Sequence, residues 1–407
     1  DRGRSARALA AGAATLALVG ACCAVAWPDS SPLVPRHGGN PVGERHWAWI
    51  YLACELGAFA AFLGGIRLVR SGGLRLRTVC VLAALIQLAP LGAPLLLSTD
   101  AWTYWGYGRI AAVRGGNPYV DPPARFPDDA AFPHLGEDWR DTTTVYGPAF
   151  TLASEPLALA AGSSPNAAAW TYKALAAAAM LGLTALAALL ARRRAFAVAF
   201  VGWNPLLALH FAGGGHNDVW MALLVVGALA LGATGRRQAA GVAWATAILV
   251  KWVPLVLLPL RALEARASGR RVGHLGFALA AVALGAAAFA RYGWDWLSAF
   301  GPLARNASRE TRYALPSRID SLGLPEHTGV LLLATGFVFA YAWLLREAAR
   351  GRARLGLASG LLLLATPWLA PWYVVWAVPL AAIDDDPAAI GIALAVSAYL
   401  LPQAVPL

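Results

Sequence analysis

The segment from Leu97 to Tyr119 carries the side chains whose types and spacing are best suited to chemistry; it reads LSTDAWTYWGYGRIAAVRGGNPY. An apolar run ends at its start, so Asp100 stands within the first few residues beyond that run. An ionisable carboxylate at that depth is costly in a bilayer unless it has partners or a function. Aromatic residues of the kind that settle at a membrane interface follow at once, namely Trp102, Tyr104, Trp105 and Tyr107. We therefore expect a carboxylate held at the membrane surface, where it is a candidate general base.

Helix capping is the alternative explanation for this carboxylate. Asp100 follows Ser98 and Thr99, and Asp is a preferred residue at the start of a helix. The same alternative applies to Asp218, which ends the motif GGGHND and precedes an apolar run. In that motif His216 is not expected to bind a metal, because no second histidine or cysteine stands at ligand spacing. Capping and function both stay open for the two aspartates, and no metal requirement is expected.

The composition limits the class of protein. Of the 407 residues 58% are hydrophobic and 14% are charged, and the mean hydropathy is +0.56. A soluble domain needs far more polar surface, so we predict a polytopic α-helical membrane protein. The net charge of +11 does not indicate nucleic-acid binding, because the arginines stand at the ends of apolar runs, where the positive-inside rule explains them. All four cysteines lie in apolar runs, which favours buried thiols over disulfides or a zinc site.

The arginine clusters also predict the topology if they are taken as cytoplasmic. A basic N-terminus precedes an uncharged run of about 20 residues, 8–27, which is long enough to span a bilayer. Two further spans, 47–66 and 78–97, then place Asp100 on the extracytoplasmic face. The chain opens with Asp and not Met, so residues are expected upstream, and no large soluble domain follows the last apolar run.

Two apolar stretches are predicted to form short broken hairpins. Residues 238–263 separate two arginine-rich ends, which cannot both be cytoplasmic if a single helix crosses the bilayer. A turn near Lys251 resolves the conflict and directs Lys251 outward into a protein cavity. Residues 355–383 are interrupted by TPWLAPWY and are expected to form a similar hairpin. The total is about 13 membrane segments.

These segments are expected to form a single all-α transmembrane domain in which five parts can be distinguished. They are three N-terminal helices (1–97), an extracytoplasmic catalytic loop with interfacial helices (98–166), central helices (167–290), a second extracytoplasmic loop (291–328) and C-terminal helices (329–407).

By this topology the candidate site residues all lie on one side of the bilayer. They are Asp100, Tyr104, Tyr107, Arg109, Asn117, Tyr119, Tyr146, His216, Asn217, Asp218, Lys251, Arg312, Arg318, Trp372 and Tyr373. A carboxylate that acts as base, cations that hold a phosphate and aromatic rings that stack on sugars are what a lipid-phosphate-sugar glycosyltransferase needs. The alternatives are that Lys251 snorkels to the interface, that the loop arginines are solvated, and that the aromatic residues form an interfacial belt.

Several motifs resemble those of the GT-C-fold glycosyltransferases, in particular the actinobacterial polyprenyl-phosphate-mannose-dependent α-1,6-mannosyltransferases. The resemblance covers most of the chain from the third predicted span onward. Its motifs are STDAWTYWGYGR (98–109) with GGNPY (115–119), VYGP (145–148), WNP (203–205) with GHND (215–218), KWVP (251–254) with LPL (258–260), and PWY (371–373).

This resemblance implies an acidic residue of the first large outer loop as the catalytic base, which corresponds to Asp100. It also implies transfer of a mannosyl residue from polyprenyl-phosphate-mannose to a mannan or glycolipid acceptor, with inversion to an α-mannoside, at the extracytoplasmic face of a bacterial plasma membrane. The expected partners are that lipid donor, the acceptor and membrane lipids, and a monomer is expected. Two departures are that two spans precede the catalytic loop, where many GT-C proteins have one, and that a separate acceptor-binding module is expected to be absent or truncated.

Three rival functions are weighed against this one. A secondary transporter also has broken helices, but it predicts an internal repeat and polar groups near the midplane, and the sequence shows neither. A non-catalytic lipid-binding subunit on the same fold stays open, since a fold does not guarantee activity. Within the enzyme class, a transferase of arabinose or another sugar from the same lipid carrier also stays open.

Overall fold

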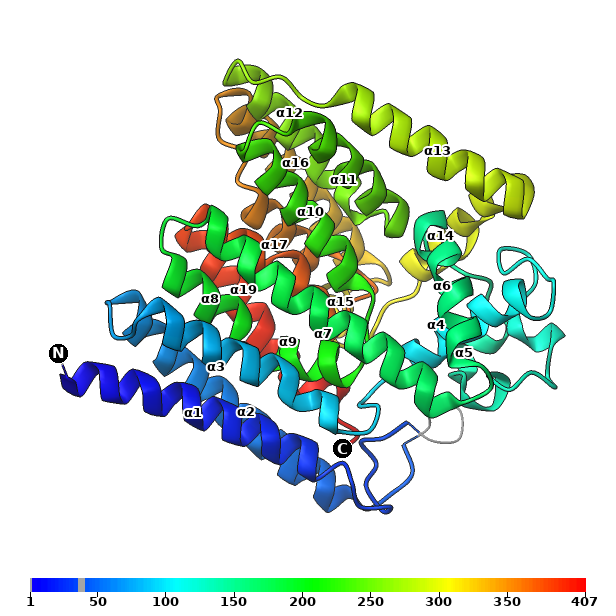
Figure 1. Cartoon of the computed structure of the whole chain (residues 1–407), viewed down its shortest axis with the longest axis horizontal. Helices are drawn as coiled ribbons and strands as arrows, with labels where there is room; N and C mark the ends of the chain where they lie inside the picture. The colour runs from blue at the N-terminus through cyan, green and yellow to red at the C-terminus, as the bar shows by residue number, and fades with distance from the viewer. Residues whose placement is uncertain (1, 36–40) are drawn as a thin grey trace.

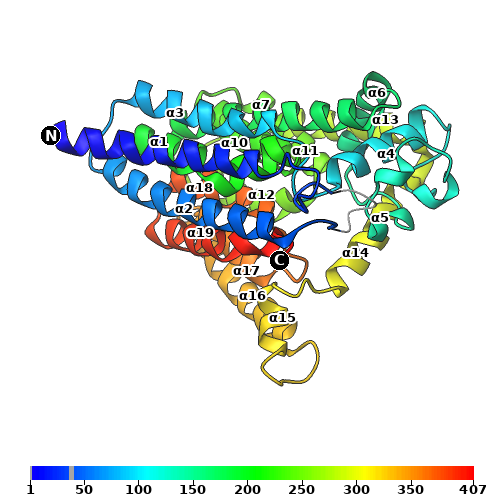
Figure 2. The same ribbon diagram turned by 90° about the horizontal axis from the view of Figure 1, so that it is seen from below.

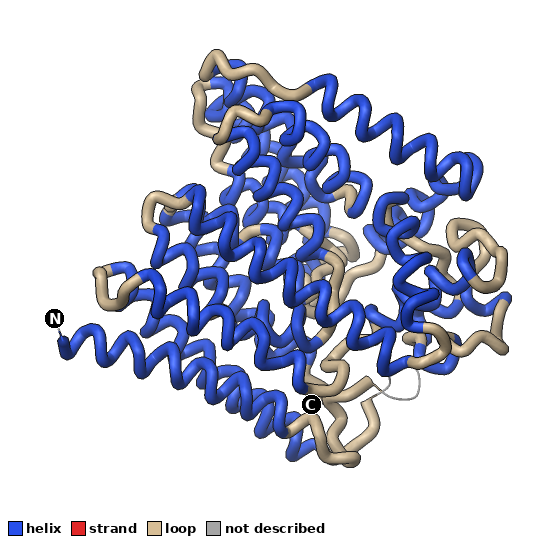
Figure 3. Tube along the Cα trace, in the orientation of Figure 1, coloured by secondary structure: helices blue, strands red, loops and turns tan. Residues whose placement is uncertain are grey.

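The structure is a computed structural model that describes residues 2–35 and 41–407, apart from the side chains of 306–308. Every regular element in this described part is a helix, which confirms the prediction of an all-α chain. Residues 36–40, which belong to the loop predicted between the spans 8–27 and 47–66, lie outside the described residues. Figure 3 shows helices throughout, with the most extended loops around the small helices at one end of the molecule.

Six helical segments are long and apolar enough to cross a membrane, which makes the chain a multi-pass membrane protein. They contain α1 (Arg2–Ala24), α2 (Arg45–Arg70), α7 (Pro165–Leu190), α13 (His274–Tyr292), α16 (Thr328–Ala349) and α19 (Pro387–Leu400). A seventh span is formed if α8 (Arg194–Gly202) is combined with the segment 205–213, to which it is bent by 53°. The bend lies at the Asn-Pro pair, as the helix-breaking effect of proline predicts. The total of about 13 membrane segments stays a prediction.

Shorter helices complete the bundle. Three are apolar, namely α3 (Leu76–Leu88), α10 (Asp218–Ala233) and α17 (Leu355–Ala365). The others are α9 (Pro205–Ala208), η5 (Leu209–Gly213), α11 (Arg237–Val250), η6 (Val253–Val256), α12 (Leu257–Ala267), α15 (Leu315–Asp320), η8 (Pro371–Trp376), α18 (Val378–Asp384) and η9 (Leu401–Ala404). Figure 1 shows α1, α2 and α3 side by side along one edge, and α13 along the opposite edge.

A group of small helices lies beyond one end of the bundle (Figures 1 and 2). It contains α4 (Asp100–Ala112), α5 (Glu137–Arg140), α6 (Pro148–Ala161), α14 (Phe300–Ser308) and the 3-10 turns η3 (Pro123–Arg125), η4 (Phe132–His134) and η7 (Gly293–Ala299), whereas the 3-10 turn η2 (Ala89–Gly92) continues α3 within the bundle. The helices α4 and α6 touch at Gly108, where an added Cβ atom would lie 2.3 Å from the carbonyl oxygen of Ser154. This close packing fixes α4, and with it Asp100, against the rest of the group.

The helices α10 and α11 form an antiparallel pair that brings two distant positions together. Asp218 is the first residue of α10, and Lys251 follows the last residue of α11. At Lys251 the backbone becomes extended, with φ −154° and ψ 135°, because Pro254 follows shortly and cannot continue a helix hydrogen-bond ladder. The start of α10 and the end of α11 therefore lie at the end of the bundle that faces α4.

Candidate functional site

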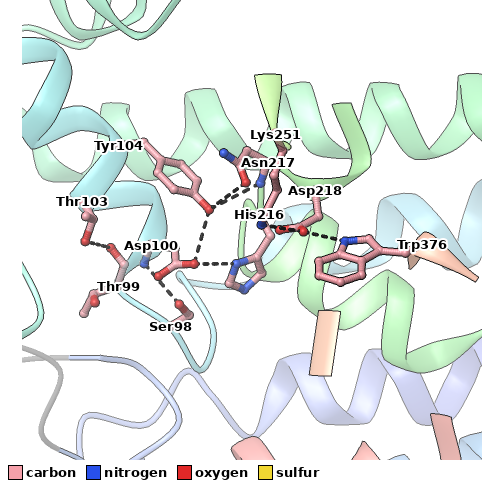
Figure 4. Close-up of polar contacts among 10 residues, drawn as sticks. All are labelled: Ser98, Thr99, Asp100, Thr103, Tyr104, His216, Asn217, Asp218, Lys251 and Trp376. Atoms are coloured by element: carbon pink, nitrogen blue, oxygen red, sulfur yellow. Dashed lines mark hydrogen bonds and ion pairs between the residues drawn. The ribbon is translucent and has the colours of Figure 1, made fainter. Parts of the chain in front are cut away.

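Asp100 begins α4 and is anchored through the backbone before it. Its N–H donates to Ser98 Oγ at 3.1 Å, and Leu97 adopts a positive φ of 61° that turns the chain into the helix. The carboxylate Oδ2 accepts from the hydroxyl of Tyr104 at 3.3 Å and lies 3.1 Å from Nδ1 of His216 (Figure 4). No backbone N–H of α4 is among the carboxylate's partners in the described residues, so the contacts favour a functional carboxylate over a helix cap.

His216 is fully buried and is held in place by stacking. The ring of Trp372 lies parallel to it, with centroids 3.6 Å apart and an interplanar angle of 13°. The backbone turns sharply before it at Gly215, whose φ of 74° belongs to the left-handed region that glycine tolerates. The glycine-rich motif thus allows the loop to place the imidazole against a helix more than 100 residues earlier in the chain.

The environment of Asp100 keeps its carboxylate ionised. Burial is the largest effect and by itself raises the pKa. The hydrogen bond with His216 and the electrostatic effects of His216 and Lys251 act in the opposite direction, and together with the Tyr104 hydrogen bond they bring the pKa of Asp100 below its usual value. At neutral pH this group is therefore a carboxylate that can accept a proton.

Lys251 and Asp218 form a second charged pair beside the first. Lys251 Nζ lies 2.6 Å from Asp218 Oδ1, and the indole N–H of Trp376 donates to the same oxygen at 2.8 Å (Figure 4). The ammonium group also lies 4.8 Å from the centroid of the Tyr373 ring. An ammonium group has three donors, so one bond to Asp218 leaves others for a ligand.

Both charged pairs border one cavity of about 850 Å³. Its polar lining includes Asp100, Tyr146 and Lys251, and its walls carry Trp372 and Tyr373. Much of the remaining lining is apolar, from Val253, Val256, Leu303 and Leu362 among others. The cavity therefore offers the carboxylate of Asp100, the ammonium group of Lys251 and an apolar wall to the same ligand, and Glu137 and Asp138 also line it.

The structure brings nine of the fifteen predicted site residues to these two pairs and the cavity. Besides the seven already placed as lining or ion-pair residues, Tyr104 and Asn217 belong to the cluster because the Tyr104 hydroxyl donates to Asn217 Oδ1 at 3.4 Å. The nine residues are Asp100, Tyr104, Tyr146, His216, Asn217, Asp218, Lys251, Trp372 and Tyr373.

The other predicted site residues have partners elsewhere. Tyr107 donates to the carbonyl of Thr142, Arg109 pairs with Asp129, Asn117 donates to the carbonyl of Tyr292, Tyr119 donates to the carbonyl of Tyr146, Arg318 donates to Tyr399, and Arg312 is exposed. None of them lines the cavity. These contacts connect all of them except Arg312 to other segments of the chain, and a direct contact with substrate stays a prediction for each of the six.

Two further residues belong to the site, although sequence reasoning did not select them. Trp376 binds Asp218, as described above. Lys173 of α7 is 1% exposed and donates to the carbonyls of Leu91, Ala93 and Pro94, which lie in the chain that leads into Asp100. The available signal for Lys173 is that it is one of two lysines in the chain and lies inside an apolar run.

Replacing His216 by Gln is expected to move the acidic limb of the activity profile to higher pH. Without the imidazole, burial dominates the environment of Asp100 and raises its pKa, so protonation inactivates the base at a higher pH than in the wild type. The measurement is kcat/KM for glycosyl transfer against pH. His134→Gln is the matched control. His134 packs against Trp102, which lies on the same helix as Asp100, but it does not contact Asp100 itself. An unchanged limb in His216→Gln would show that His216 does not tune the base.

No metal-binding group is apparent in the described residues, where no three His, Cys, Asp or Glu side chains gather closely enough to hold an ion.

Comparison with known proteins identifies relatives of the chain. A protein of Mycolicibacterium smegmatis named "Probable alpha-(1->6)-mannopyranosyltransferase" is 29% identical over 367 residues, covering 75% of this chain and 65% of that protein. The alpha-(1->6)-mannopyranosyltransferase A of Mycobacterium tuberculosis is 28% identical, covering 71% of this chain and 63% of the relative. Alpha-(1->6)-mannopyranosyltransferase B of Corynebacterium glutamicum is 27% identical, covering 84% of this chain and 64% of the relative.

The chain thus spans less than two thirds of the length of these relatives. No solved structure matches significantly. Residues 7–266 match the family described as alpha-(1->6)-mannopyranosyltransferase, N-terminal domain, and residues 144–398 match glycosyltransferase family 87. These matches confirm the resemblance that the motifs indicated, and the chain belongs to the alpha-(1->6)-mannopyranosyltransferase family of membrane glycosyltransferases.

Proposed function

We propose that this protein transfers a mannosyl residue from polyprenyl-phosphate-mannose to a hydroxyl group of a mannan or glycolipid acceptor, with inversion and formation of an α-1,6 linkage. The observation that carries the proposal is that an ionised Asp100 and the ammonium group of Lys251 line one cavity. Family membership supports the sugar and the linkage, since the relatives are named for them. We infer that the reaction takes place at the extracytoplasmic face of a bacterial plasma membrane, because the arginine clusters predict that Asp100 lies on that side.

Asp100 acts as the general base in this reaction. Its Oδ2 atom is held by Tyr104 and His216, which leaves Oδ1 to accept the proton of the acceptor hydroxyl. As that proton moves to Asp100, the acceptor oxygen forms a bond to the anomeric carbon, and the bond from this carbon to the phosphate oxygen breaks. The electron pair leaves with the polyprenyl phosphate. One base suffices, because phosphate is already a good leaving group.

Lys251 stabilises the departing phosphate. Charge develops on the phosphate oxygen as the bond breaks, and a cation already in position lowers the energy of that transition state. Asp218 and Trp376 fix the ammonium group at the cavity, so little reorganisation is needed during the reaction. The apolar residues of the cavity wall accommodate the first isoprene units of the donor lipid.

Purified protein in detergent, with a chelator present, is expected to transfer radiolabelled mannose from polyprenyl-phosphate-mannose to a short α-mannoside. Digestion of the product with a linkage-specific α-mannosidase then tests the 1,6 linkage. Transfer from polyprenyl-phosphate-arabinose but not from the mannosyl donor would contradict the sugar assignment. Binding of both donors without any transfer would favour the non-catalytic lipid-binding subunit.

The side of the reaction is tested separately in sealed vesicles of opposite orientation. With a membrane-impermeant acceptor, only vesicles that expose the extracytoplasmic face are expected to form product. Product from the opposite orientation alone would contradict the topology derived from the arginine clusters.

A further inference from the structure

A second concavity lies at the ends of α10 and α11 that are remote from Asp100. The helix α10 begins beside the site at Asp218, and its 16 residues extend about 24 Å at a rise of 1.5 Å per residue. At the far end, the start of α11, the end of α12, the loop 268–273 and the start of α13 surround a groove of about 720 Å³. An inner cavity of about 250 Å³ shares several lining residues with this groove.

The groove is strongly basic at its mouth. The arginines of the groove and its inner cavity come from three segments; Arg237, Arg266, Arg270 and Arg271 line the groove, and Arg261 lines the inner cavity. Glu264 pairs with two of them, Arg261 and Arg270. Within the described part of the chain, the other three have no carboxylate at ion-pair distance and are exposed. The groove therefore presents several positive charges that the protein itself does not neutralise.

The interior of the groove is apolar and is formed by fixed walls. Trp244, Leu258 and Phe277 line the inner cavity from α11, α12 and α13. The helices α11 and α13 meet through Gly276, where an added Cβ atom would lie 2.1 Å from the carbonyl oxygen of Gln238. The N–H of Gly276 also donates to Oε1 of Gln238 at 2.7 Å. This backbone contact keeps the two walls in place, so the groove exists before any ligand binds.

Arginines at the ends of membrane helices are common, because they determine topology. Arg2 and Arg7 of α1 are examples that are simply exposed on one helix. The arginines of the groove differ from these because they surround a cavity with an apolar interior. A basic pocket between membrane helices is a recognition site for the head groups of anionic lipids.

We propose that this groove binds an anionic phospholipid. The phosphate group lies among Arg237, Arg266 and Arg271, and an acyl chain extends past Trp244 and Phe277 between the helices. The site is separate from the cavity that contains Asp100 and does not depend on the proposed glycosyl transfer. It would couple the protein to the lipid composition of the leaflet on that side of the membrane.

Native mass spectrometry of the detergent-purified full chain tests this proposal by titration with palmitoyl-oleoyl phosphatidylglycerol and with the corresponding phosphatidylcholine. The wild type is expected to prefer phosphatidylglycerol. The triple variant Arg237→Gln/Arg266→Gln/Arg271→Gln is expected to bind it at least about tenfold more weakly, since each basic residue near an anionic lipid contributes appreciably. The matched control Arg2→Gln/Arg7→Gln/Arg77→Gln removes the same charge from exposed positions and is expected to bind like the wild type.

A neutral substitution tests the groove itself. Ala262 is exposed in the groove, so Ala262→Trp fills the space without changing the charge or the core, and it is expected to weaken phosphatidylglycerol binding. Equal losses in the two triple variants, or full binding by Ala262→Trp, would overturn the proposal in favour of general attraction to basic surface. Displacement of the lipid by millimolar inorganic phosphate would equally overturn it, because the acyl chain would then contribute nothing.

Discussion

Replacement of Asp100 by Asn is expected to lower kcat for mannosyl transfer by about 10²- to 10⁴-fold, the usual contribution of a general base. Asn has the same shape and can still accept a hydrogen bond from Nδ1 of His216, but it cannot take a proton from the acceptor hydroxyl. KM for the donor is expected to change little, because the Lys251–Asp218 pair is left intact. Steady-state transfer with labelled donor measures both parameters.

The matched control for this substitution is Asp128→Asn. Asp128 lies in the same large loop and pairs with Arg114, but its side chain is 77% exposed and does not line the cavity. This variant is expected to keep wild-type activity. Asp100→Asn with full activity and an unchanged thermal unfolding profile would mean that Asp100 serves only to start α4, and the proposed base would have to be sought elsewhere.

The local sequence was sufficient to select Asp100 and Lys251. Asp100 is a carboxylate directly after an apolar run. Lys251 is a lysine at the point where two arginine-rich ends required a turn. Both charged groups are costly in a membrane unless they have partners or a function. Each inference depends on a few neighbouring residues and on the thickness of a bilayer. The helical class of the chain follows for the same reason, since a bilayer leaves few ways to satisfy the backbone.

The contacts of these residues could not be predicted in the same way. The bond between Asp100 and His216 joins residues 116 positions apart, and the ring that stacks on His216 comes from η8 near the C-terminus. Such contacts depend on how the helices pack, which periodicity and charge do not determine. The cation Arg109 shows the reverse case, because its partner Asp129 lies only 20 residues further along in the same loop.

Lys173 is a buried charged residue that supports the site through the backbone, and a search for pairs of opposite charges does not find it. Its ammonium group has backbone carbonyls as acceptors rather than a carboxylate. A search for complementary charges does not detect such a partner. The consequence for the site is nevertheless direct, because these carbonyls belong to the segment that ends at Asp100.

Replacement of Lys251 by Met is the second substitution with a large expected effect. It removes the cation proposed to stabilise the departing phosphate, and it leaves Asp218 as a buried carboxylate without its ionic partner. Breaking one side of a buried ion pair typically costs about 3 to 5 kcal/mol of stability. We therefore expect a loss of transfer of at least about 100-fold, the typical effect of removing one transition-state donor, together with a lower unfolding temperature.

The double variant Lys251→Met/Asp218→Asn separates these two effects. It removes both charges, so the uncompensated carboxylate is gone, and Asn can still accept the indole N–H of Trp376. Thermal unfolding is expected to return toward that of the wild type, while kcat/KM for transfer stays low. Recovery of transfer in the double variant would show that Lys251 matters only because it neutralises Asp218. Persistent loss of transfer in a protein of restored stability would leave contact with the donor phosphate as the role of Lys251.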